Sequence, residues 1–221
     1  METLRMKSHN TNGMLITFCG LDGCGKSTMI KRFTGWLEKE QDICPVLTKE
    51  PTNAVRSSDI FRTFMDCENN SVYDYRSLSL FAASDRVQHS SKIIYPILQK
   101  GETVISDRYF YSCLANLRAR GYIKDQWIYE ISESIIKPDI AFFLDVPVEK
   151  AIRRVRSRPE ETYRYIDIDL QHKLKDEYKE ICLKNGGILV PTNINEDETF
   201  EIICNAYIEN RKEKENERNS I

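Results

Sequence analysis

Short runs of apolar and β-branched residues alternate along the chain with longer stretches in which apolar residues recur every three or four positions. The short runs predict strands and the longer stretches predict helices, because side chains alternate faces along a strand and return to one face of a helix every 3.6 residues. The strands are expected at 14–19, 44–48, 103–106, 140–144 and 188–190. The helices are expected at 26–41, 57–67, 73–100, 109–120, 124–136, 148–158 and 167–184, with a last one at 199–208.

This alternation predicts an α/β fold in which a five-stranded parallel sheet is flanked by helices. Ligands of such sheets bind beyond the carboxyl ends of the strands. No repeat and no linker rich in Gly, Ser or Pro divides the chain, so a single domain over 1–221 is expected. Residues 1–12 form a polar N-terminal extension, and residues 210–221 form a charged C-terminal tail to which no function is assigned.

The composition excludes some classes of function. Hydrophobic residues make up 41% and charged residues 30%, which is typical of a folded globular protein. A net charge of -2 offers no general attraction for nucleic acid, and no stretch approaches the roughly 20 apolar residues of a membrane span. The seven cysteines are odd in number and contain no Cys-x-x-Cys pair, so reduced thiols and a cytoplasmic location are expected.

The stretch GLDGCGKST, residues 20–28, lies between the first predicted strand and the first predicted helix. It fits the phosphate-binding pattern G-x-x-x-x-G-K-[ST] in the context that the pattern requires. Glycines let the backbone approach phosphate oxygens, the lysine reaches the β and γ phosphates, and the hydroxyl that follows ligates Mg²⁺. The predicted ATP-binding residues are Gly20, Gly23, Cys24, Gly25, Lys26, Ser27 and Thr28.

A second carboxylate ends the predicted strand 103–106, where Asp107 is expected to hold Mg²⁺ together with Ser27. Arg108 follows directly, and its guanidinium could bind an acceptor phosphate through two hydrogen bonds. Capping of the next helix is the structural alternative for Asp107. With Lys26, these two residues are candidate catalytic groups.

Arginines gather near the end of the predicted helix 148–158. Arg154 and Arg158 share one helix face, where like charges repel unless an anion lies between them. Together with Arg156 they predict a mobile lid over about 153–166 that closes on ATP. The alternative is a solvated basic helix end that the helix dipole favours.

Taken together, these residues resemble the thymidylate kinase family of nucleoside monophosphate kinases, over nearly the whole chain after Gly13. Besides the glycine-rich loop, the resemblance is carried by KEP at 49–51, DRVQH at 85–89, DRY at 107–109 with Ser112, PDIAFFLDVP at 138–147 and the arginines of the lid. It implies phosphate transfer from ATP-Mg²⁺ to a nucleoside monophosphate, most simply dTMP, by a homodimer.

The resemblance also implies roles for individual residues. Asp22 would meet the acceptor's sugar hydroxyl, and Arg108 with Lys49 would hold its phosphate. Gly23 with an arginine-rich lid is similar to those members that carry the catalytic arginine in the lid. The substrate-binding residues implied are Asp22, Lys49, Glu50, Pro51, Phe81, Arg86, Arg108, Tyr109, Ser112, Cys113 and Asn116.

Two positions depart from the family pattern. The ring expected four residues before Arg86 is replaced by Ala82, and Phe81 lies five residues before Arg86, which turns it to another helix face. A π-bulge within 81–86 would return Phe81 to the side of Arg86. At position 116 the family often has an aromatic that helps exclude a 2′-hydroxyl, whereas the Asn116 amide could bind one.

Other activities remain open at this point. The acceptor could be another monophosphate, such as dUMP, UMP or CMP, because the reaction type is better supported than the base. A deoxynucleoside kinase would use Glu50 next to Pro51 as the general base that a 5′-hydroxyl acceptor needs. A nucleotide-dependent switch that transfers no phosphate to a small molecule is the alternative from a different class.

Overall fold

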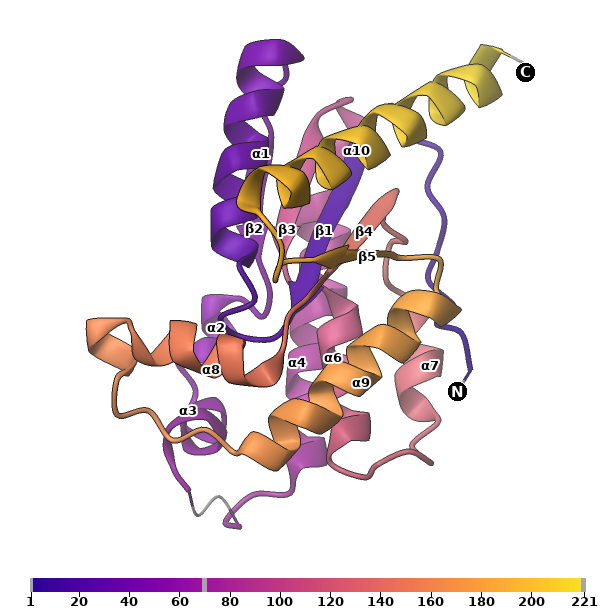
Figure 1. The fold of residues 1–221 in the computed structure, drawn as a ribbon. Helices are drawn as coiled ribbons and strands as arrows, with labels where there is room; N and C mark the ends of the chain where they lie inside the picture. The colour runs from indigo at the N-terminus through magenta and orange to yellow at the C-terminus, as the bar shows by residue number, and fades with distance from the viewer. Residues whose placement is uncertain (1, 69–70, 220–221) are drawn as a thin grey trace.

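The computed structural model describes residues 2–68 and 71–219 and contains one five-stranded sheet (Figure 1). The predicted five-stranded parallel sheet is confirmed, with the order β2-β3-β1-β4-β5 and parallel pairing throughout. Its strands are β1 (Met14–Gly20), β2 (Val46–Lys49), β3 (Thr103–Asp107), β4 (Ile140–Asp145) and β5 (Ile188–Pro191). Each predicted strand therefore exists, with ends shifted by one or two residues.

Helices cover both faces of the sheet. Those that build or flank the cleft are α1 (Lys26–Glu40), α2 (Asn53–Arg56), α3 (Asp59–Asp66), α4 (Tyr75–His89), α6 (Phe110–Ala119), α8 (Val148–Arg156) and α9 (Ile168–Lys184). The others are α5 (Tyr95–Gln99), α7 (Trp127–Ser132), α10 (Glu196–Asn219), a π turn η1 (Ser90–Ile94) and a 3₁₀ turn η2 (Pro159–Glu161). Figure 1 shows α2, α3 and α8 gathered at the carboxyl end of the strands. None of the helices within the described residues is long and apolar enough to cross a membrane.

Aromatic side chains fill the core on each face of the sheet. Neighbouring residues of a strand point to opposite faces, so Phe142 and Phe143 of β4 pack on different helices. Phe142 lies 5.0 Å from Phe18, between ring centroids, on the side of α1 and α10. Phe143 lies 5.1 Å from Tyr111 of α6 on the other side. The rigid sheet thus holds the carboxyl ends of β1 and β3 in one position.

The single helix predicted over 73–100 is wrong in one respect, because the chain forms α4, the π turn η1 and α5 in succession. Tyr95 donates its N–H to the oxygen of Ser90, five residues back. Pro96 follows and has no N–H to give, so the regular α pattern is interrupted just before it. The π-bulge predicted within 81–86 is absent: that segment lies inside the regular helix α4.

Other helices differ in length from the expectation. The predicted helix 57–67 is α3, preceded by the short α2, and the predicted helix 124–136 is only α7. The last helix, expected at 199–208, is α10 and continues to Asn219, so most of the charged tail is helical. Positions 220 and 221 of that tail lie outside the described residues.

The N-terminal extension and the C-terminal helix meet at Asp139, just before β4. One carboxylate oxygen accepts hydrogen bonds from the N–H of Leu15, at 2.7 Å, and lies 3.1 Å from His9 Nε2. The other accepts from Lys214 Nζ at 2.6 Å. Burial alone would raise the pKa of Asp139, but the hydrogen bonds from His9 and Lys214 outweigh it and lower that pKa. Asp139 therefore fastens three distant segments together.

Replacing Asp139 with asparagine is expected to lower the free energy of unfolding at pH 7 by about 2 kcal/mol, the scale of a hydrogen bond to a charged group. A carboxyl whose pKa falls on folding stabilises the protein above its ordinary pKa and loses this effect as the pH falls. The difference between wild type and D139N should therefore shrink below about pH 4. Urea unfolding at pH 7 and pH 3.5 measures it, and an equal loss at both values would contradict the ionic contribution.

Candidate active site

The loop after β1 is shaped by glycines in left-handed conformations, which other residues rarely adopt. Gly20, Gly23 and Gly25 have φ values of 136°, 78° and 100°. A Cβ at Gly23 would lie 2.2 Å from the oxygen of Ala151, so the loop packs against the backbone of α8 and leaves no room for a side chain there. A loop of this kind at the N-terminus of α1 presents N–H groups to an anion.

Lys26 begins α1 and folds back over this loop. The residue is buried, and its Nζ donates hydrogen bonds to the oxygens of Leu21, at 2.7 Å, and Gly20, at 3.1 Å. These partners are neutral carbonyls, which bind a charged amine less strongly than a phosphate does. The ammonium group is thus held at the loop, within the cleft, where an anion would improve its bonding.

Arg108 follows β3 in a strained backbone conformation, with a φ of 72°. Its N–H donates to the oxygen of Phe18 at 2.8 Å, and its guanidinium donates to Gly20 O at 3.0 Å and to Tyr178 Oη at 3.1 Å. Its Nη2 lies 2.5 Å from Asp22 Oδ1. Such strain persists only where the surroundings fix the residue, as they do here. The guanidinium is therefore placed beside the phosphate loop.

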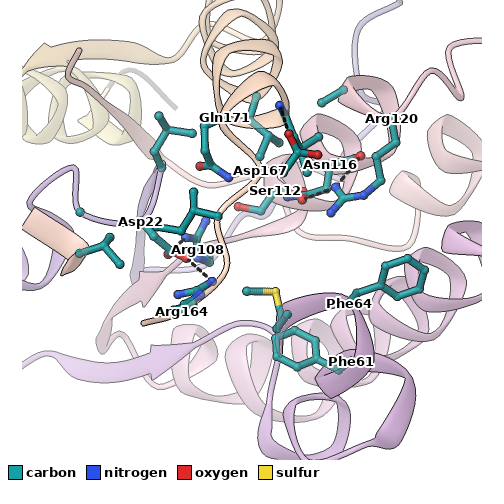
Figure 2. Close-up of a pocket in the computed structure, with 18 of the residues that line it drawn as sticks. Asp22, Phe61, Phe64, Arg108, Ser112, Asn116, Arg120, Arg164, Asp167 and Gln171 are labelled. Carbon is teal, nitrogen blue, oxygen red and sulfur yellow. Dashed lines mark hydrogen bonds and ion pairs between the residues drawn. The ribbon is translucent and has the colours of Figure 1, made fainter. Parts of the chain in front are cut away.

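Asp22 is held between two arginines, as Figure 2 shows: its second oxygen lies 3.1 Å from Nη2 of Arg164, in the lid. Burial alone would raise the pKa of the Asp22 carboxyl. The charges of Arg108, Lys26 and Arg164 outweigh this effect and hold that pKa well below its ordinary range. Burial likewise disfavours charge on Arg108, but Asp22 outweighs it and raises the Arg108 pKa. Asp22 and Arg108 are consequently ionised at neutral pH.

Asp107 ends β3 and lines the same cleft as the loop. Its Oδ2 lies 3.3 Å from Lys49 Nζ, while its Oδ1 is buried and has no hydrogen-bond partner among the described residues. An orphaned carboxylate oxygen near the exposed Ser27 hydroxyl fits Mg²⁺, which takes one or two protein oxygens and completes its shell with waters and phosphates. No cluster of three or more His, Cys, Asp or Glu suited to a metal occurs within the described residues.

Arg56 of α2 joins this group, although no sequence motif indicated it. It is half-buried, its Nε donates to the oxygen of Pro51 at 2.7 Å, and it lines the same cleft as Lys49 and Arg108. Burial lowers the pKa of Arg56, and the neighbouring charge of Arg108 lowers it further. Cations held together out of water favour an anion between them.

A cleft of about 1620 Å³ connects these groups. Its volume exceeds that of a typical pocket for one small ligand, about 300–1,000 Å³, and leaves room for two. Most of the predicted site residues line it: Asp22, Gly23, Gly25, Lys26, Ser27, Thr28, Lys49, Pro51, Arg86, Asp107, Arg108, Ser112, Cys113, Asn116 and Arg158. Gly20, Cys24, Glu50, Phe81, Tyr109, Arg154 and Arg156 are not among the lining residues.

Phe81 is displaced from the site because α4 is regular. The face that α4 turns to the cleft carries Tyr75, Ser79, Ala82 and Arg86, while Phe81 is 40% exposed and does not line it. Phe81 therefore does not reach the cleft in which it was predicted to bind the acceptor's base. Aromatic rings reach the cleft from α3 instead, as Phe61 and Phe64 in Figure 2. The apolar periodicity of residues 57–67 predicted a helix but could not show that its rings face the site.

Asn116 has both halves of its amide engaged inside the protein. Nδ2 donates to the oxygen of Ser112 at 2.9 Å, and Oδ1 accepts from Arg120 Nη1 at 2.9 Å (Figure 2). The Arg120 guanidinium lies 3.9 Å from the centre of the Tyr75 ring, in a cation–π contact. Asn116 thus lines the cleft with its side chain fixed by two hydrogen bonds, and it retains one N–H of Nδ2 and acceptor capacity on Oδ1.

The side chains of Glu50 and Tyr109, which were also predicted to bind substrate, point into the core. Glu50 is fully buried and pairs with Arg86 and His89 instead of facing the cleft. Tyr109 is also fully buried, and its hydroxyl donates to the oxygen of Ile136 at 2.6 Å. These two side chains therefore do not line the cleft in which they were predicted to contact substrate.

The lid arginines divide into different roles. Arg154 donates to the oxygens of Gly23, at 3.3 Å, and Thr192, at 3.1 Å, and so braces the phosphate loop from outside the cleft. Arg156 is exposed, and Arg158 lines the cleft near Glu161. Arg164, six residues beyond the predicted arginine cluster, makes the lid's contact with Asp22 that was described above.

Three features define a P-loop protein of the nucleotide kinase class. They are the glycine-lined loop with its buried lysine, the carboxylate that ends the neighbouring strand, and the arginines that line the same cleft. The sequence profile of the family described as "Thymidylate kinase" matches residues 18–203. The chain belongs to the thymidylate kinase family, and it is therefore an enzyme of the phosphate-transferring class.

Individual relatives agree with this assignment. A "Probable thymidylate kinase" of Thermococcus kodakarensis is 38% identical over 200 residues, which cover 88% of this chain and 95% of that relative. A "Thymidylate kinase" of Prochlorococcus marinus is 36% identical over 162 residues, covering 67% and 74%. A "Probable thymidylate kinase" of Methanococcus maripaludis is 32% identical over 203 residues, covering 88% and 94%.

Proposed function

We propose that the protein transfers the γ-phosphate of ATP to dTMP and forms dTDP and ADP. The observation that carries this proposal is the gathering of Arg56, Arg108 and Lys49 in the cleft that also contains the phosphate loop. Such a cluster suits an acceptor that is itself a phosphate. The relatives named thymidylate kinase support thymidine as its nucleoside.

On the donor side, the loop over 20–28 would bind the β and γ phosphates, with Lys26 moving from its carbonyl partners to the phosphate oxygens. Arg158 and Arg164 approach from the lid. A guanidinium there can neutralise charge that spreads over the transferring group. We assign Arg154 to holding the loop in shape, because both of its hydrogen bonds go to main-chain oxygens.

Mg²⁺ would be held by Asp107, Ser27 and the phosphates. When bound, it would neutralise charge between the β and γ oxygens as the phosphoryl group moves. Lys49 pairs with Asp107 and lines the cleft together with Arg56 and Arg108. It would therefore link the metal-binding residues to the residues that hold the acceptor phosphate. The orphaned Asp107 Oδ1 supports this assignment.

On the acceptor side, the phosphate oxygen is already ionised near neutral pH, so attack requires positioning and charge neutralisation and no general base. Asp22, kept ionised by its arginines, could accept a hydrogen bond from the sugar hydroxyl. Arg86 lines the base end of the cleft, with Phe61 and Phe64 as an apolar wall. Guanidinium donors suit a base with carbonyl acceptors, such as thymine.

The deoxynucleoside kinase alternative is not favoured. That reaction needs a carboxylate to take the proton of a 5′-hydroxyl. Glu50, the carboxylate proposed for that role, is fully buried and held by Arg86 and His89 away from the cleft. The acceptor end of the cleft instead offers cations.

A panel of monophosphates tests the choice of base and sugar. With saturating ATP-Mg²⁺, kcat/KM for dTMP should exceed that for dUMP, UMP and CMP, and thymidine should not be phosphorylated. Asn116 makes the comparison of deoxy with ribo acceptors informative, since it stands where an aromatic would crowd a 2′-hydroxyl. A clear preference for UMP or CMP would overturn dTMP as the acceptor while keeping the reaction.

Replacing Arg56 with glutamine should raise the KM for dTMP roughly 10-fold or more, because a lost hydrogen bond to a charged group is worth about 1.5–3 kcal/mol. The KM for ATP should change little, since Arg56 lies on the acceptor side. Arg76→Gln is the matched control, as Arg76 is exposed and pairs with Asp74 outside the cleft. Steady-state kinetics with each substrate varied separately measures both values. Equal changes in both KM values would contradict the assignment.

We also propose that the protein is a homodimer in the cytosol. Support comes from exposed apolar side chains on the segment from α4 to α5, Leu80, Phe81, Ile93 and Tyr95, each 39–49% exposed. The seven cysteines are free, as a reducing compartment requires. Sedimentation at micromolar concentration should give the dimer mass, and Phe81→Glu should shift it to the monomer. A monomeric wild type would contradict the dimer.

A further inference from the structure

A polar cluster with a buried centre joins the end of β2 to α4 behind the cleft. It consists of Thr48, Glu50 and Thr52 on one segment and Asp85, Arg86 and His89 on the other, and we call it the 48–52 clamp. Its centre is the Glu50 carboxylate, which is fully buried. One oxygen lies 3.0 Å from His89 Nδ1, and the other lies 3.1 Å from Arg86 Nε.

The His89 ring is held on both sides. A carboxylate only accepts hydrogen bonds, so His89 Nδ1 carries the proton and donates it to Glu50. The other ring nitrogen, Nε2, lies 2.8 Å from the Thr48 hydroxyl oxygen. The ring therefore cannot turn without losing a buried hydrogen bond, and it fixes the direction of the Glu50 carboxylate.

Arg86 is fixed by the same carboxylate at the border of the cleft. It is only 2% exposed, its Nη1 donates to the oxygen of Ala82 at 2.9 Å, and its Nε faces Glu50. A buried charge is stable only when it is paired. Glu50 is thus the counter-ion that allows a nearly buried guanidinium to line the cleft.

The clamp continues toward the cations proposed to hold the acceptor phosphate, Lys49, Arg56 and Arg108. Asp85 accepts a hydrogen bond from the N–H of Thr52 at 2.8 Å and another from the Thr52 hydroxyl. Between the two clamped residues lies Pro51, whose oxygen accepts from Arg56 Nε at 2.7 Å. The segment that carries Lys49 and Arg56 is therefore fastened to the helix that carries Arg86.

We propose that Glu50 and His89 are positioning residues for the acceptor. Through the 48–52 clamp they fix the position of Arg86, at one end of the acceptor site, relative to Arg56 and Lys49 at the other end. The inference rests on the proposed function, since it assumes that a monophosphate spans these groups. Neither residue contacts the acceptor itself. Their loss should weaken acceptor binding and leave the ATP side intact.

The test compares two substitutions of His89 that differ in which nitrogen they replace. His89→Asn keeps an N–H near the position of Nδ1 and can still donate to Glu50, whereas His89→Gln places its amide near Nε2. We expect H89Q to raise the KM for dTMP about 10-fold, with kcat and the KM for ATP within about twofold of wild type. H89N should restore the KM for dTMP to within about threefold. Gln88→Ala, at an exposed neighbouring position, is the control.

A second arm uses Glu50→Gln, which preserves shape and removes the charge. Alone it should raise the KM for dTMP at least as much as H89Q, and H89Q should add little in its presence, because both act through the same carboxylate. Calorimetric binding of dTMP without ATP gives a readout independent of turnover, and it applies to the H89N and H89Q pair even if E50Q fails to fold.

The outcomes separate the two proposals. If wild type neither binds dTMP nor transfers phosphate to any monophosphate, the proposed function fails. If wild type binds dTMP but H89N and H89Q bind it equally well, the clamp proposal is wrong. A lower melting temperature in H89Q with unchanged dTMP affinity would also overturn it, because the cluster would then serve stability alone.

Discussion

Replacing Lys26 with alanine should lower kcat/KM about 10²- to 10³-fold, the cost of removing one preorganised electrostatic contact to a reacting group. The ammonium group is buried in the phosphate loop, where it donates to the oxygens of Leu21 and Gly20 and to the sulfur of Cys24. No other lysine begins α1, so none can take its place. The measurement is ADP formation with dTMP at saturating ATP-Mg²⁺.

The matched control for this change is Lys31→Ala. Lys31 lies on the same helix but is exposed to solvent, so its loss should leave turnover within about twofold of wild type. The melting temperature of K26A should stay close to that of wild type, because the hydrogen bonds lost go only to neutral partners, two carbonyls and one thiol. Nearly full activity in K26A would refute the role of the loop in catalysis.

Replacing Asp107 with asparagine should have an effect of similar size, a loss of about 10²-fold or more in kcat. Asparagine keeps the shape but removes the negative charge that attracts Mg²⁺, and it leaves Lys49 without its ion pair. The buried Oδ1 has no hydrogen-bond partner among the described residues, so the carboxylate is not needed to satisfy a neighbour at that atom. Turnover as a function of Mg²⁺ concentration measures this effect.

Asp145→Asn provides the control at the same edge of the sheet. Asp145 ends the neighbouring strand β4 but pairs with Lys175, at 3.2 Å, and Lys179, at 3.5 Å, and none of the three lines the cleft. D107N should require more Mg²⁺ for half-maximal rate, whereas D145N should resemble wild type. An unchanged Mg²⁺ dependence in D107N would show that the metal is held elsewhere.

The strands and the phosphate loop could be predicted from the sequence because their signals are local. The central strands β1, β3 and β4 are buried apolar runs, and the edge strands β2 and β5 are short β-rich runs, so all five were found. The loop motif needs only its own residues and the flanking strand and helix. Lys26, Ser27 and Asp107 were placed correctly in the cleft for this reason. Topology then brings the ends of β1 and β3 together.

Side-chain directions that depend on distant partners could not be predicted in this way. The pattern KEP showed a carboxylate after the second strand, but residues about 40 positions further on, Arg86 and His89, turn Glu50 into the core. Arg56 and Arg164 belong to no motif, and only the packing of α2 and the lid places them at the site. Their place at the site is therefore set by tertiary packing, which local sequence patterns do not show.

The helix face on which Phe81 lies could be predicted from its spacing to Arg86. Its separation of five residues from Arg86 already placed the two side chains on different faces of a regular helix. The predicted bulge that would have reunited them is absent, and the irregular turn lies at Ser90–Ile94, just before Pro96. Phe61 and Phe64 of α3 reach the cleft instead, as does Tyr75 of α4.

In this cleft a phosphoryl group is expected to move from ATP to a monophosphate. Incubation with ATP labelled in the γ position, Mg²⁺ and either dTMP or thymidine, followed by separation of the labelled products, tests this transfer. We expect labelled dTDP from dTMP and no labelled dTMP from thymidine. Label on thymidine, or release of labelled phosphate without transfer to either acceptor, would contradict it.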